Sequence, residues 1–199
     1  MARKTDPKNF ERVLDAAATL FLDVGYDATS MQLLADRLGL HKSSLYHYVK
    51  GKEDLLEHLI NEAQTTAEND LETAEQDLEN GYLTAIRLAI EQTLNDRRRV
   101  SLVLRQKPGT ATGDGVITRR RAYDQRLAKL IKRDQRSGAI RNDIHPMLLA
   151  RLTLGLVAWM VEWYNPKLTR FSAEEICEAA LAVVTHGVTL PQLPPKKPR

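Results

Sequence analysis

The sequence predicts an all-α protein, with a small three-helix unit at the N-terminus and a larger helical unit after it. Three observations support this fold class. Apolar residues recur at spacings of three and four along nearly every segment, which is the period of an amphipathic helix. Strand-like alternation is absent, and runs of β-branched residues are short. Glycine ends several of the periodic segments, as it often does at helix C-termini.

Size and composition are those of an ordinary globular chain. Its 199 residues are 43% hydrophobic and 28% charged, which is enough for one or two domains with a real core. No uninterrupted run of 18 apolar residues occurs, and the N-terminus lacks the apolar core of a secretion signal. Cys177 is the single cysteine, which excludes an internal disulfide. We therefore expect a cytoplasmic protein without a membrane span.

The first two helices have clear boundaries in the sequence. Residues 10–24 carry an apolar stripe that ends at Gly25, which predicts a first helix. Ser30 is expected to cap a second helix over residues 31–38, because its hydroxyl can accept a hydrogen bond from a main-chain N–H of the first turn.

Longer helices are expected in the rest of the chain. A fourth helix begins near Lys52 and runs through an acidic block. Asp143 is a candidate N-cap ahead of Pro146, and Ser172 forms a capping box with Glu175. The other expected elements are helices over residues 82–96, 98–106, 116–137, 147–164 and 172–188, a loop over 107–115 and a disordered tail over 191–199.

The net charge of +3 conceals a segregated distribution. Residues 53–80 contain ten acidic and no basic side chains, whereas residues 97–136 contain thirteen Lys or Arg against three Asp or Glu. Two interpretations are open. The basic block is either a solvated face that pairs with the acidic block, or a binding surface for an anionic ligand whose phosphate or carboxylate groups suit the arginine fork.

Residues 31–49 have the spacing of a helix-turn-helix. Ala35 is small where two helices would approach, and Gly39, four residues later, can form the tight turn between them. Leu45 is then expected to pack the next helix, residues 42–49, onto the one before it. Polar residues surround that leucine: Lys42, Ser43, Ser44, Tyr46, His47 and Tyr48. A short helix with a buried leucine and such a polar face is suited to the major groove of DNA.

These residues resemble a known DNA-binding domain. The segment ATSMQLLADRLGLHKSSLYHYVKGKEDLL at residues 28–56, preceded by VLDAAATLFLDVGY at residues 13–26, is similar to the N-terminal domain of the TetR family of bacterial regulators. The resemblance implies a helix-turn-helix DNA-binding domain over residues 1–52, and a helical ligand-binding and dimerisation domain over residues 53–190. One departure is His41, which stands where the family commonly has a Ser or Thr cap.

The resemblance also implies roles for individual DNA-facing residues. Phosphate contacts are expected from Thr29, Ser30, Tyr46, His47 and Lys52. Contacts with base edges are expected from Lys42, Ser43 and Ser44. Phosphate contacts set the register and give salt-dependent affinity, whereas base contacts select the sequence. Two alternatives stay open: these side chains form only a solvated surface, or Tyr46 packs its ring against the first helix.

The last two helices are apolar on more than one face. Each is therefore expected to be buried both by its own core and by a second copy of the chain. Their apolar residues are Leu148, Leu149, Leu152, Leu156, Trp159, Met160 and Trp163 in the first helix, and Ile176, Ala179, Ala180, Val183 and Val184 in the second. The resemblance likewise implies a homodimer built on a four-helix bundle. Such a dimer would present two helix-turn-helices to a palindromic operator, with half-site centres about 34–36 Å apart or a multiple of that distance.

The middle helices combine apolar and basic side chains, which suits an anionic effector with an apolar tail, such as an acyl-CoA thioester. The segment VAWMVEWYNP at residues 157–166 is also similar to that of TetR-type regulators of lipid, steroid or aromatic catabolism that sense acyl-CoAs. The candidate effector-binding residues are Leu102, Arg105, Arg119, Tyr123, Trp159 and Trp163.

The expected function is a ligand-responsive bacterial transcriptional regulator, and in the family's usual mode a homodimeric repressor that its effector releases from the operator. Activation is an open alternative. An all-α enzyme, or a helical ligand carrier or scaffold without DNA binding, is the competing function class. No Ser-His-Asp, zinc-protease, P-loop or paired-carboxylate pattern stands out, and the five histidines lack partners at metal-ligand spacing. We expect no enzyme activity, no cofactor and no metal.

Overall fold

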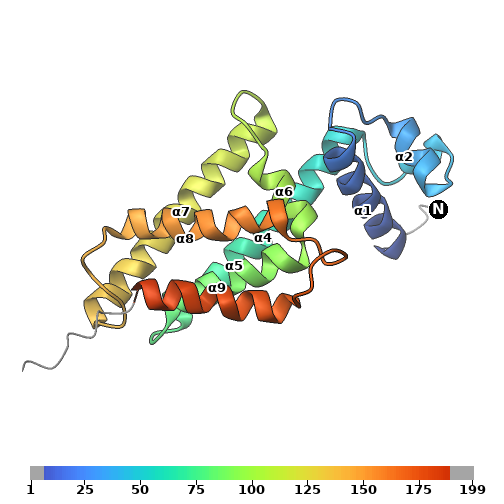
Figure 1. Cartoon of the computed structure of the whole chain (residues 1–199). Coiled ribbons are helices and arrows are strands. Elements are labelled where there is room, and N and C mark those ends of the chain that lie inside the picture. Colours follow the sequence, from blue (N-terminus) through green and yellow to red (C-terminus); the bar gives the residue numbers. More distant parts are fainter. Residues whose placement is uncertain (1–6, 189–199) are drawn as a thin grey trace, which may run out of the picture. The chain divides into compact units, whose positions relative to one another are not determined.

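The computed structural model describes residues 7–188, and within that range all regular structure is helical (Figure 1). The predicted all-α fold is confirmed. The helices are α1 (Pro7–Asp23), α2 (Met31–Leu38), α3 (Lys42–Leu45), α4 (Lys52–Gln76), α5 (Gly81–Asn95), α6 (Arg97–Leu104), α7 (Ala111–Ser137), α8 (Pro146–Trp163) and α9 (Ala173–Val188). The predicted disordered tail over residues 191–199 lies outside the described part of the chain.

Two compact units divide the described residues. The first comprises the residues up to Thr66 together with Asp96–Arg119, and the second comprises Ala67–Asn95 and the residues from Arg120 onward. α4 and α7 therefore contribute to both units, and α6 belongs with the N-terminal helices. These packing units differ from the domains expected from the sequence, which divide at residue 52.

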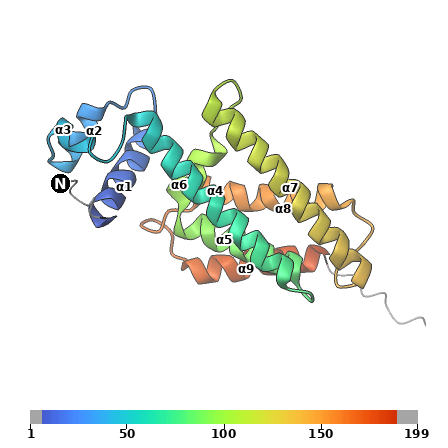
Figure 2. The same ribbon diagram turned by 180° about the vertical axis from the view of Figure 1, so that it is seen from behind.

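The first unit has its own core beneath the helix-turn-helix. α2 contacts both α1 and α3 (Figure 2), and α6 also packs on α1. Leu45 is fully covered, as predicted for the residue that packs α3 onto α2, and Leu34 of α2 is fully covered as well. The other buried apolar residues of this core are Val13, Leu14, Ala17, Ala18, Leu20, Phe21, Met31, Ala35, Val49, Leu55, Leu56, Leu59, Ile60, Leu102 and Val116.

The ends of α2 are stabilised as the sequence predicts. Gly39 follows the helix with φ 66° and ψ 33°, a left-handed conformation in which a Cβ would crowd the backbone. The Leu40 N–H donates to the Ala35 carbonyl at 2.9 Å, which closes the C-terminus of α2. At the N-terminus, the Ser30 hydroxyl accepts a hydrogen bond from the Leu33 N–H at 3.1 Å.

α3 is shorter than the predicted helix over residues 42–49. It ends at Leu45, and residues 46–48 form a turn in which the Tyr48 N–H donates to the Leu45 carbonyl at 2.9 Å. His41 occupies the N-cap position and makes no side-chain capping hydrogen bond. Short helices depend on caps and on packing, so a helix without a cap is held mainly by its buried leucine.

α7 begins at Ala111 rather than at residue 116, because the chain before it supplies a cap. The Thr110 hydroxyl accepts a hydrogen bond from the Gly113 N–H at 3.0 Å. A Cβ on Gly113 would lie 1.9 Å from the Lys107 carbonyl oxygen, so only glycine permits this close approach. The glycines of residues 107–115 led us to predict a loop there, but Gly113 lies in the first turn of α7.

The second unit is built around α5, which contacts α8 and α9. The Tyr82 N–H at the start of α5 donates to Asp134 Oδ2 on α7 at 2.8 Å, and Arg133 Nε lies 2.9 Å from the other carboxylate oxygen. These two partners compensate the burial of the Asp134 carboxylate. The buried apolar residues of this core are Leu71, Ala74, Tyr82, Ala85, Ile86, Ile90, Leu94, Leu127, Leu130, Ile131, Ile140, Leu149, Ala150, Val157, Met160, Tyr164, Ile176, Cys177, Ala180, Leu181 and Val184.

The last two helices begin with local capping interactions. Pro146 is the first residue of α8, as predicted, but the N-cap is His145 and not Asp143. The Asp143 carboxylate instead accepts hydrogen bonds from a neighbouring arginine guanidinium, which leaves it unavailable to the helix. The capping box of α9 is confirmed: the Ser172 N–H donates to Glu175 Oε2 at 2.7 Å, and the Glu175 N–H donates to Ser172 Oγ at 3.1 Å.

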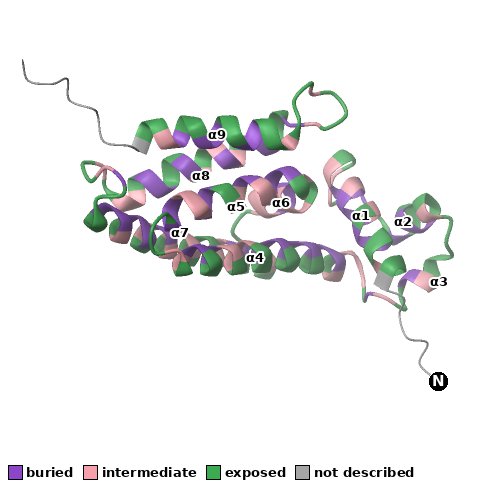
Figure 3. Cartoon of the chain, turned by 90° about the horizontal axis from the view of Figure 1, so that it is seen from below, coloured by how far each residue is buried: buried purple, intermediate pink, exposed green. Residues whose placement is uncertain are grey.

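One side of α8 is buried, and the other carries exposed apolar residues. Figure 3 colours the helices by the burial of each residue. The exposed apolar face of α8 consists of Leu148, Leu152, Trp159 and Trp163. Their spacing of four and seven residues places them along one side of the helix. Leu149, Val157 and Met160 lie on the opposite, buried side. The structure thus shows which apolar residues of α8 lie in the core and which are exposed. The sequence alone did not distinguish the two groups.

α8 is also the one helix in the described residues that is long and apolar enough to cross a membrane, with a mean hydropathy of 1.2. This criterion uses length and composition alone, and a core helix of a globular protein can satisfy it. Arg151 and Glu162 lie within the helix, and its buried side packs in the core of the second unit.

Candidate nucleic-acid interface and effector residues

The polar residues of the helix-turn-helix lie on its surface. Lys42, Ser43 and His47 are exposed, and the Tyr46 side chain is 49% exposed. Leu45, between them in the sequence, is fully buried. Because the Leu45 side chain points into the core, the side chains next to it in the sequence point away from the core. The donors predicted to contact DNA therefore lie on one accessible surface. Ser44 also belongs to this segment and is half-buried.

Tyr48, rather than Tyr46, packs against the first helix. Its ring stacks on Phe10 with 6.0 Å between centroids and 2° between planes. Phe10 also meets the His58 ring edge-on at 5.4 Å. Tyr48 therefore takes the packing role that was considered for Tyr46, and Tyr46 is about half exposed. Sequence spacing could have suggested this, since Tyr48 and Leu45 are three residues apart on one side of the chain.

Thr29 and Ser30 differ in accessibility although both were expected at phosphates. Ser30 is exposed at the N-terminus of α2. Thr29 is 3% exposed, and its hydroxyl donates to the Gly25 carbonyl at 2.7 Å. The structure therefore differs from the expectation for Thr29, whose side chain is enclosed within the loop that precedes α2. A hydroxyl has one hydrogen to donate, and here that hydrogen is already used.

Lys52 also makes interactions that the sequence did not indicate. Its ammonium group donates to main-chain carbonyls of the loop between α1 and α2, and it lies over the Tyr26 ring. The expected phosphate contact of Lys52 stays a prediction. The interactions with the loop are considered again below.

Two family models match the chain. Residues 13–59 match the model described as "Bacterial regulatory proteins, tetR family", and residues 83–188 match "Tetracyclin repressor-like, C-terminal domain". The chain belongs to the TetR family. It is a transcriptional regulator with a DNA-binding helix-turn-helix, and TetR-family regulators are not enzymes. The predicted family and function class are confirmed, and the enzyme alternative is excluded by this membership.

Named TetR-family relatives resemble the chain over most of its length. The transcriptional repressor KstR2 of Mycolicibacterium smegmatis is 28% identical over 191 residues, covering 92% of this chain and 91% of the relative. The structure of SCO3833 from Streptomyces coelicolor A3 has a TM-score of 0.77 at 30% identity, covering 89% of this chain and 91% of that one. AibR in complex with isovaleryl coenzyme A and operator DNA has a TM-score of 0.73 at 26% identity, covering 87% and 96%.

The predicted effector residues are divided between the two units of this TetR-family chain. Leu102 is buried in the core of the first unit, and Arg105 is exposed at the end of α6. Arg119 donates to the side chains of Asn61 and Thr65 on α4, at 3.1 Å and 3.3 Å. These three residues therefore belong to the surroundings of the DNA-binding helices.

The three aromatic candidates belong to the second unit. Tyr123 packs against its core, and burial, with a smaller contribution from Asp70, raises the Tyr123 pKa to about 12. Trp159 is 66% exposed and Trp163 is about half exposed, so both lie on the exposed apolar face of α8. Among the three aromatic residues predicted to bind the effector, Tyr123 is therefore the one that packs in the interior of the second unit.

Sequence reasoning missed Tyr82, which has an unusual environment. Its hydroxyl is buried in the second core without a hydrogen bond to the described residues, and burial raises its pKa to about 12. The Thr153 hydroxyl lies nearby but donates its hydrogen to the Leu149 carbonyl at 2.9 Å, so the Tyr82 oxygen receives no hydrogen bond from it. Buried polar groups without partners are rare in folded proteins. The available signal was a tyrosine in the apolar stripe that continues with Ile86 and Ile90.

Several arginines of the basic block already bind protein partners. Arg126 donates to both carboxylate oxygens of Glu75, from Nε at 2.9 Å and from Nη2 at 2.8 Å. Arg133 donates to the main-chain carbonyls of Glu75 and Asp77. The acidic and basic blocks thus pair in part, as the first interpretation of the charge pattern predicts. Arg120 is exposed, and its charge opposes the rise in the Asp124 pKa that burial causes.

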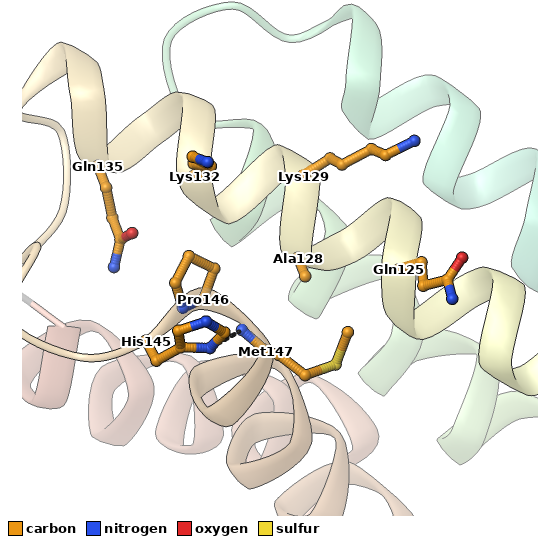
Figure 4. A pocket seen from close by; sticks show the side chains of 8 residues that line it. All are labelled: Gln125, Ala128, Lys129, Lys132, Gln135, His145, Pro146 and Met147. Carbon is orange, nitrogen blue, oxygen red and sulfur yellow. Dashed lines mark hydrogen bonds between the residues drawn. The ribbon is translucent and has the colours of Figure 1, made fainter.

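A groove of about 540 Å³ lies between α7 and the start of α8 (Figure 4). Its lining residues are Gln125, Ala128, Lys129, Lys132, Gln135, His145, Pro146 and Met147. None of them was predicted from the sequence to bind an effector. Figure 4 shows the Gln135 side chain pointing toward His145 and Pro146. The Gln135 amide donates to the carbonyls of Arg141 and Ile144, at 3.0 Å and 2.8 Å, so it also holds the α7–α8 connection in place.

Among residues 7–188, no group of three His, Cys, Asp or Glu side chains is arranged to hold a metal ion. Cys177, the single cysteine, is buried in the second core, where burial raises the pKa of its thiol.

Proposed function

We propose that this regulator is a repressor, like its relative KstR2, and that it contacts its operator through the exposed donors of α3 and the turn after it. Lys42, Ser43 and Ser44 are assigned to base edges, and Tyr46 and His47 to phosphates. Ser30 is assigned to a phosphate at the N-terminus of α2, where helix N–H groups favour an anion. The observation that supports this assignment is the accessible polar surface around the fully buried Leu45.

Operator binding can be tested with DNA from the intergenic region upstream of the protein's own gene. Replacing Lys42 by Met should weaken binding to the preferred sequence about tenfold or more, since a good base contact contributes about 1–3 kcal/mol. Lys129→Met in the groove of the second unit removes the same charge and serves as the control. Equal affinities of the two variants would contradict the assignment.

We further propose that two copies associate through the exposed apolar face of α8 together with α9, where Val183 is also exposed. Burial of two tryptophans and two leucines from each copy supplies a large apolar contact, and aromatic side chains contribute strongly to interface energetics. The resulting dimer would carry two helix-turn-helices, as recognition of a palindromic operator requires.

The effector is proposed to be an acyl-CoA thioester that binds in the second unit. The relative AibR, whose crystal structure contains isovaleryl coenzyme A and operator DNA, supports this class of effector. The buried Tyr82 hydroxyl supports binding in the core, because a polar group of the ligand would satisfy its missing hydrogen bond. Exposed arginines of the basic block, such as Arg120, supply positive charge that suits the CoA phosphates.

The effector would act by favouring a conformation that does not bind DNA. α4 and α7 contribute to both units, so a change in either helix within the second unit is transmitted along a continuous helix into the first. Switching the population from 1:99 to 99:1 requires a differential affinity of about 5.5 kcal/mol between the two conformations.

A thermal-shift series tests the class of effector. Acyl-CoAs of increasing chain length are compared with free CoA and with the matching free acids. A ligand at about 100 times its Kd stabilises the protein by about 2.7 kcal/mol, which raises the melting temperature by about 5–10 °C for a chain of this size. The same acyl-CoA should release the operator in a gel-shift experiment. No shift with any CoA species at saturation would overturn the proposal.

A further inference from the structure

Lys52 is the first residue of α4, and its ammonium group is bound to the loop between α1 and α2 (residues 24–30). Nζ donates to the carbonyl oxygens of Tyr26, Asp27 and Thr29, at distances of 2.9, 3.2 and 3.3 Å. An ammonium group has three hydrogens and no acceptor, so three carbonyls use its full hydrogen-bonding capacity. We call this arrangement the loop clamp.

The Tyr26 ring completes the surroundings of the ammonium group. Lys52 Nζ lies 4.5 Å from the ring centroid, within the range of a cation–π interaction. The ring itself meets Phe21 of α1 edge-on, with 5.1 Å between centroids. Phe21 is part of the core of the first unit. The loop clamp therefore connects the start of α4 to the end of α1.

A lysine at this position would be unfavourable without such partners. The N-terminus of a helix carries a partial positive charge, so a cation in the first turn is repelled. Carbonyl oxygens and an aromatic face are the sources of negative potential that compensate it. Glu53 and Asp54, also in the first turn of α4, add negative charge nearby.

We propose that Lys52 is a positioning residue of the helix-turn-helix, which holds the loop before α2 in place, and that it does not contact a DNA phosphate. The loop leads directly to Ser30, the N-cap of α2. Thr29 also takes part, because its N–H donates to the carbonyls of Gly25 and Tyr26, at 3.1 Å and 3.2 Å. A loosened loop would shift the start of α2, and operator affinity would fall without loss of a charge contact.

Two substitutions of Lys52 separate the two roles. Lys52→Arg keeps the charge, but a planar guanidinium cannot direct three donors at three convergent carbonyls. Lys52→Met removes the charge and keeps most of the side-chain length. Hydrogen exchange of the Thr29 amide is measured on the free protein. The salt dependence of binding is measured with DNA from the upstream intergenic region.

For the loop clamp, both variants should exchange the Thr29 amide about tenfold faster, a factor that corresponds to about 1.4 kcal/mol of lost local stability. Lys52→Met should also bind DNA more weakly with the same salt dependence. Lys50→Met is the control, because Lys50 is exposed two residues away and its loss should leave the Thr29 amide protected. Tyr26→Leu, which removes the ring without a change in charge, should reproduce the faster exchange.

A phosphate contact predicts different results. The slope of log affinity against log salt would then decrease by about 0.9 per subunit in Lys52→Met beyond the change in Lys50→Met. Lys52→Arg would retain both affinity and slope, because a guanidinium also binds phosphate. That combination, with unchanged exchange of the Thr29 amide in both variants, would overturn the proposal.

Discussion

Arg99 on α6 forms an ion pair with Glu62 on α4, with 3.1 Å between Nε and Oε2. The same guanidinium contacts Glu11 on α1 and Asp96, the N-cap of α6, and the Arg99 side chain is only 12% exposed. Burial raises the pKa of Glu62, and the charge of Arg99 opposes that rise. One guanidinium therefore connects three helices of the first unit, among them α6, which packs on α1.

Replacing Arg99 by Gln should destabilise the first unit. The substitution leaves clustered carboxylates without their counter-charge, and hydrogen bonds between charged groups contribute about 1–2 kcal/mol at partly exposed sites. We expect the melting temperature to fall by about 2–8 °C. Arg98→Gln is the control, because Arg98 is exposed and adjacent in the sequence. Equal melting temperatures of the two variants would show that the cluster contributes nothing.

Replacing Leu152 by Glu should separate the proposed dimer into monomers. The Leu152 side chain is 60% exposed in the single chain, so the substitution has little effect on the fold, but it would place a charge in the centre of the apolar contact. Leu168→Glu provides the comparison, since Leu168 is 81% exposed and lies outside the exposed apolar face of α8. Sedimentation velocity distinguishes the two states. A dimeric Leu152→Glu variant would exclude this face as the interface.

Replacing Gly39 by Ala should weaken the helix-turn-helix. The φ of 66° at Gly39 costs an L-residue about 1 kcal/mol, so we expect a lower midpoint of urea denaturation. Gly115→Ala is expected to have the opposite effect. Gly115 lies inside α7, and an added Cβ meets no atom within 4 Å. Alanine there should therefore stabilise the chain by about 0.5–1 kcal/mol. Effects of the same sign at both sites would contradict the backbone argument.

The ion pair between Glu75 and Arg126 predicts a loss of stability in acid. Hydrogen bonds from Arg126 lower the pKa of Glu75, so its carboxylate is favoured in the folded protein. This stabilisation is present above the unfolded pKa of about 4.3 and is lost as the pH falls through the lower pKa of the folded state. Glu75→Gln should therefore be less stable than the parent at neutral pH, and the difference should vanish in strong acid.

The boundaries of several elements could be predicted because caps depend only on nearby residues. Ser30, Gly39 and the capping box at Ser172 act through main-chain groups within four or five positions. The same reasoning was less successful where two local signals compete. Glycines in the segment before α7 predicted a loop, but a threonine cap and a close contact at Gly113 began the helix there.

The candidate DNA surface was predicted in outline and corrected in detail. The exposed donors of α3 were expected, since a buried Leu45 places its neighbours outward. The burial of Thr29 and the loop contacts of Lys52 were not expected, because their partners are carbonyl groups of a loop whose path depends on tertiary folding. Main-chain carbonyls have no signature in the sequence.

Periodic hydrophobicity, helix caps and the Ala35–Gly39–Leu45 spacing determined on their own that the chain is all-helical and carries a helix-turn-helix, because these features arise from contacts within a few residues. Only the tertiary structure decided which apolar side of α8 is covered, that Tyr48 and not Tyr46 packs on the first helix, and that Lys52 binds a loop. The reason is that burial depends on the neighbouring helices. A side chain is buried only when residues distant in the sequence cover it, and the local pattern of apolar residues does not show which residues those are.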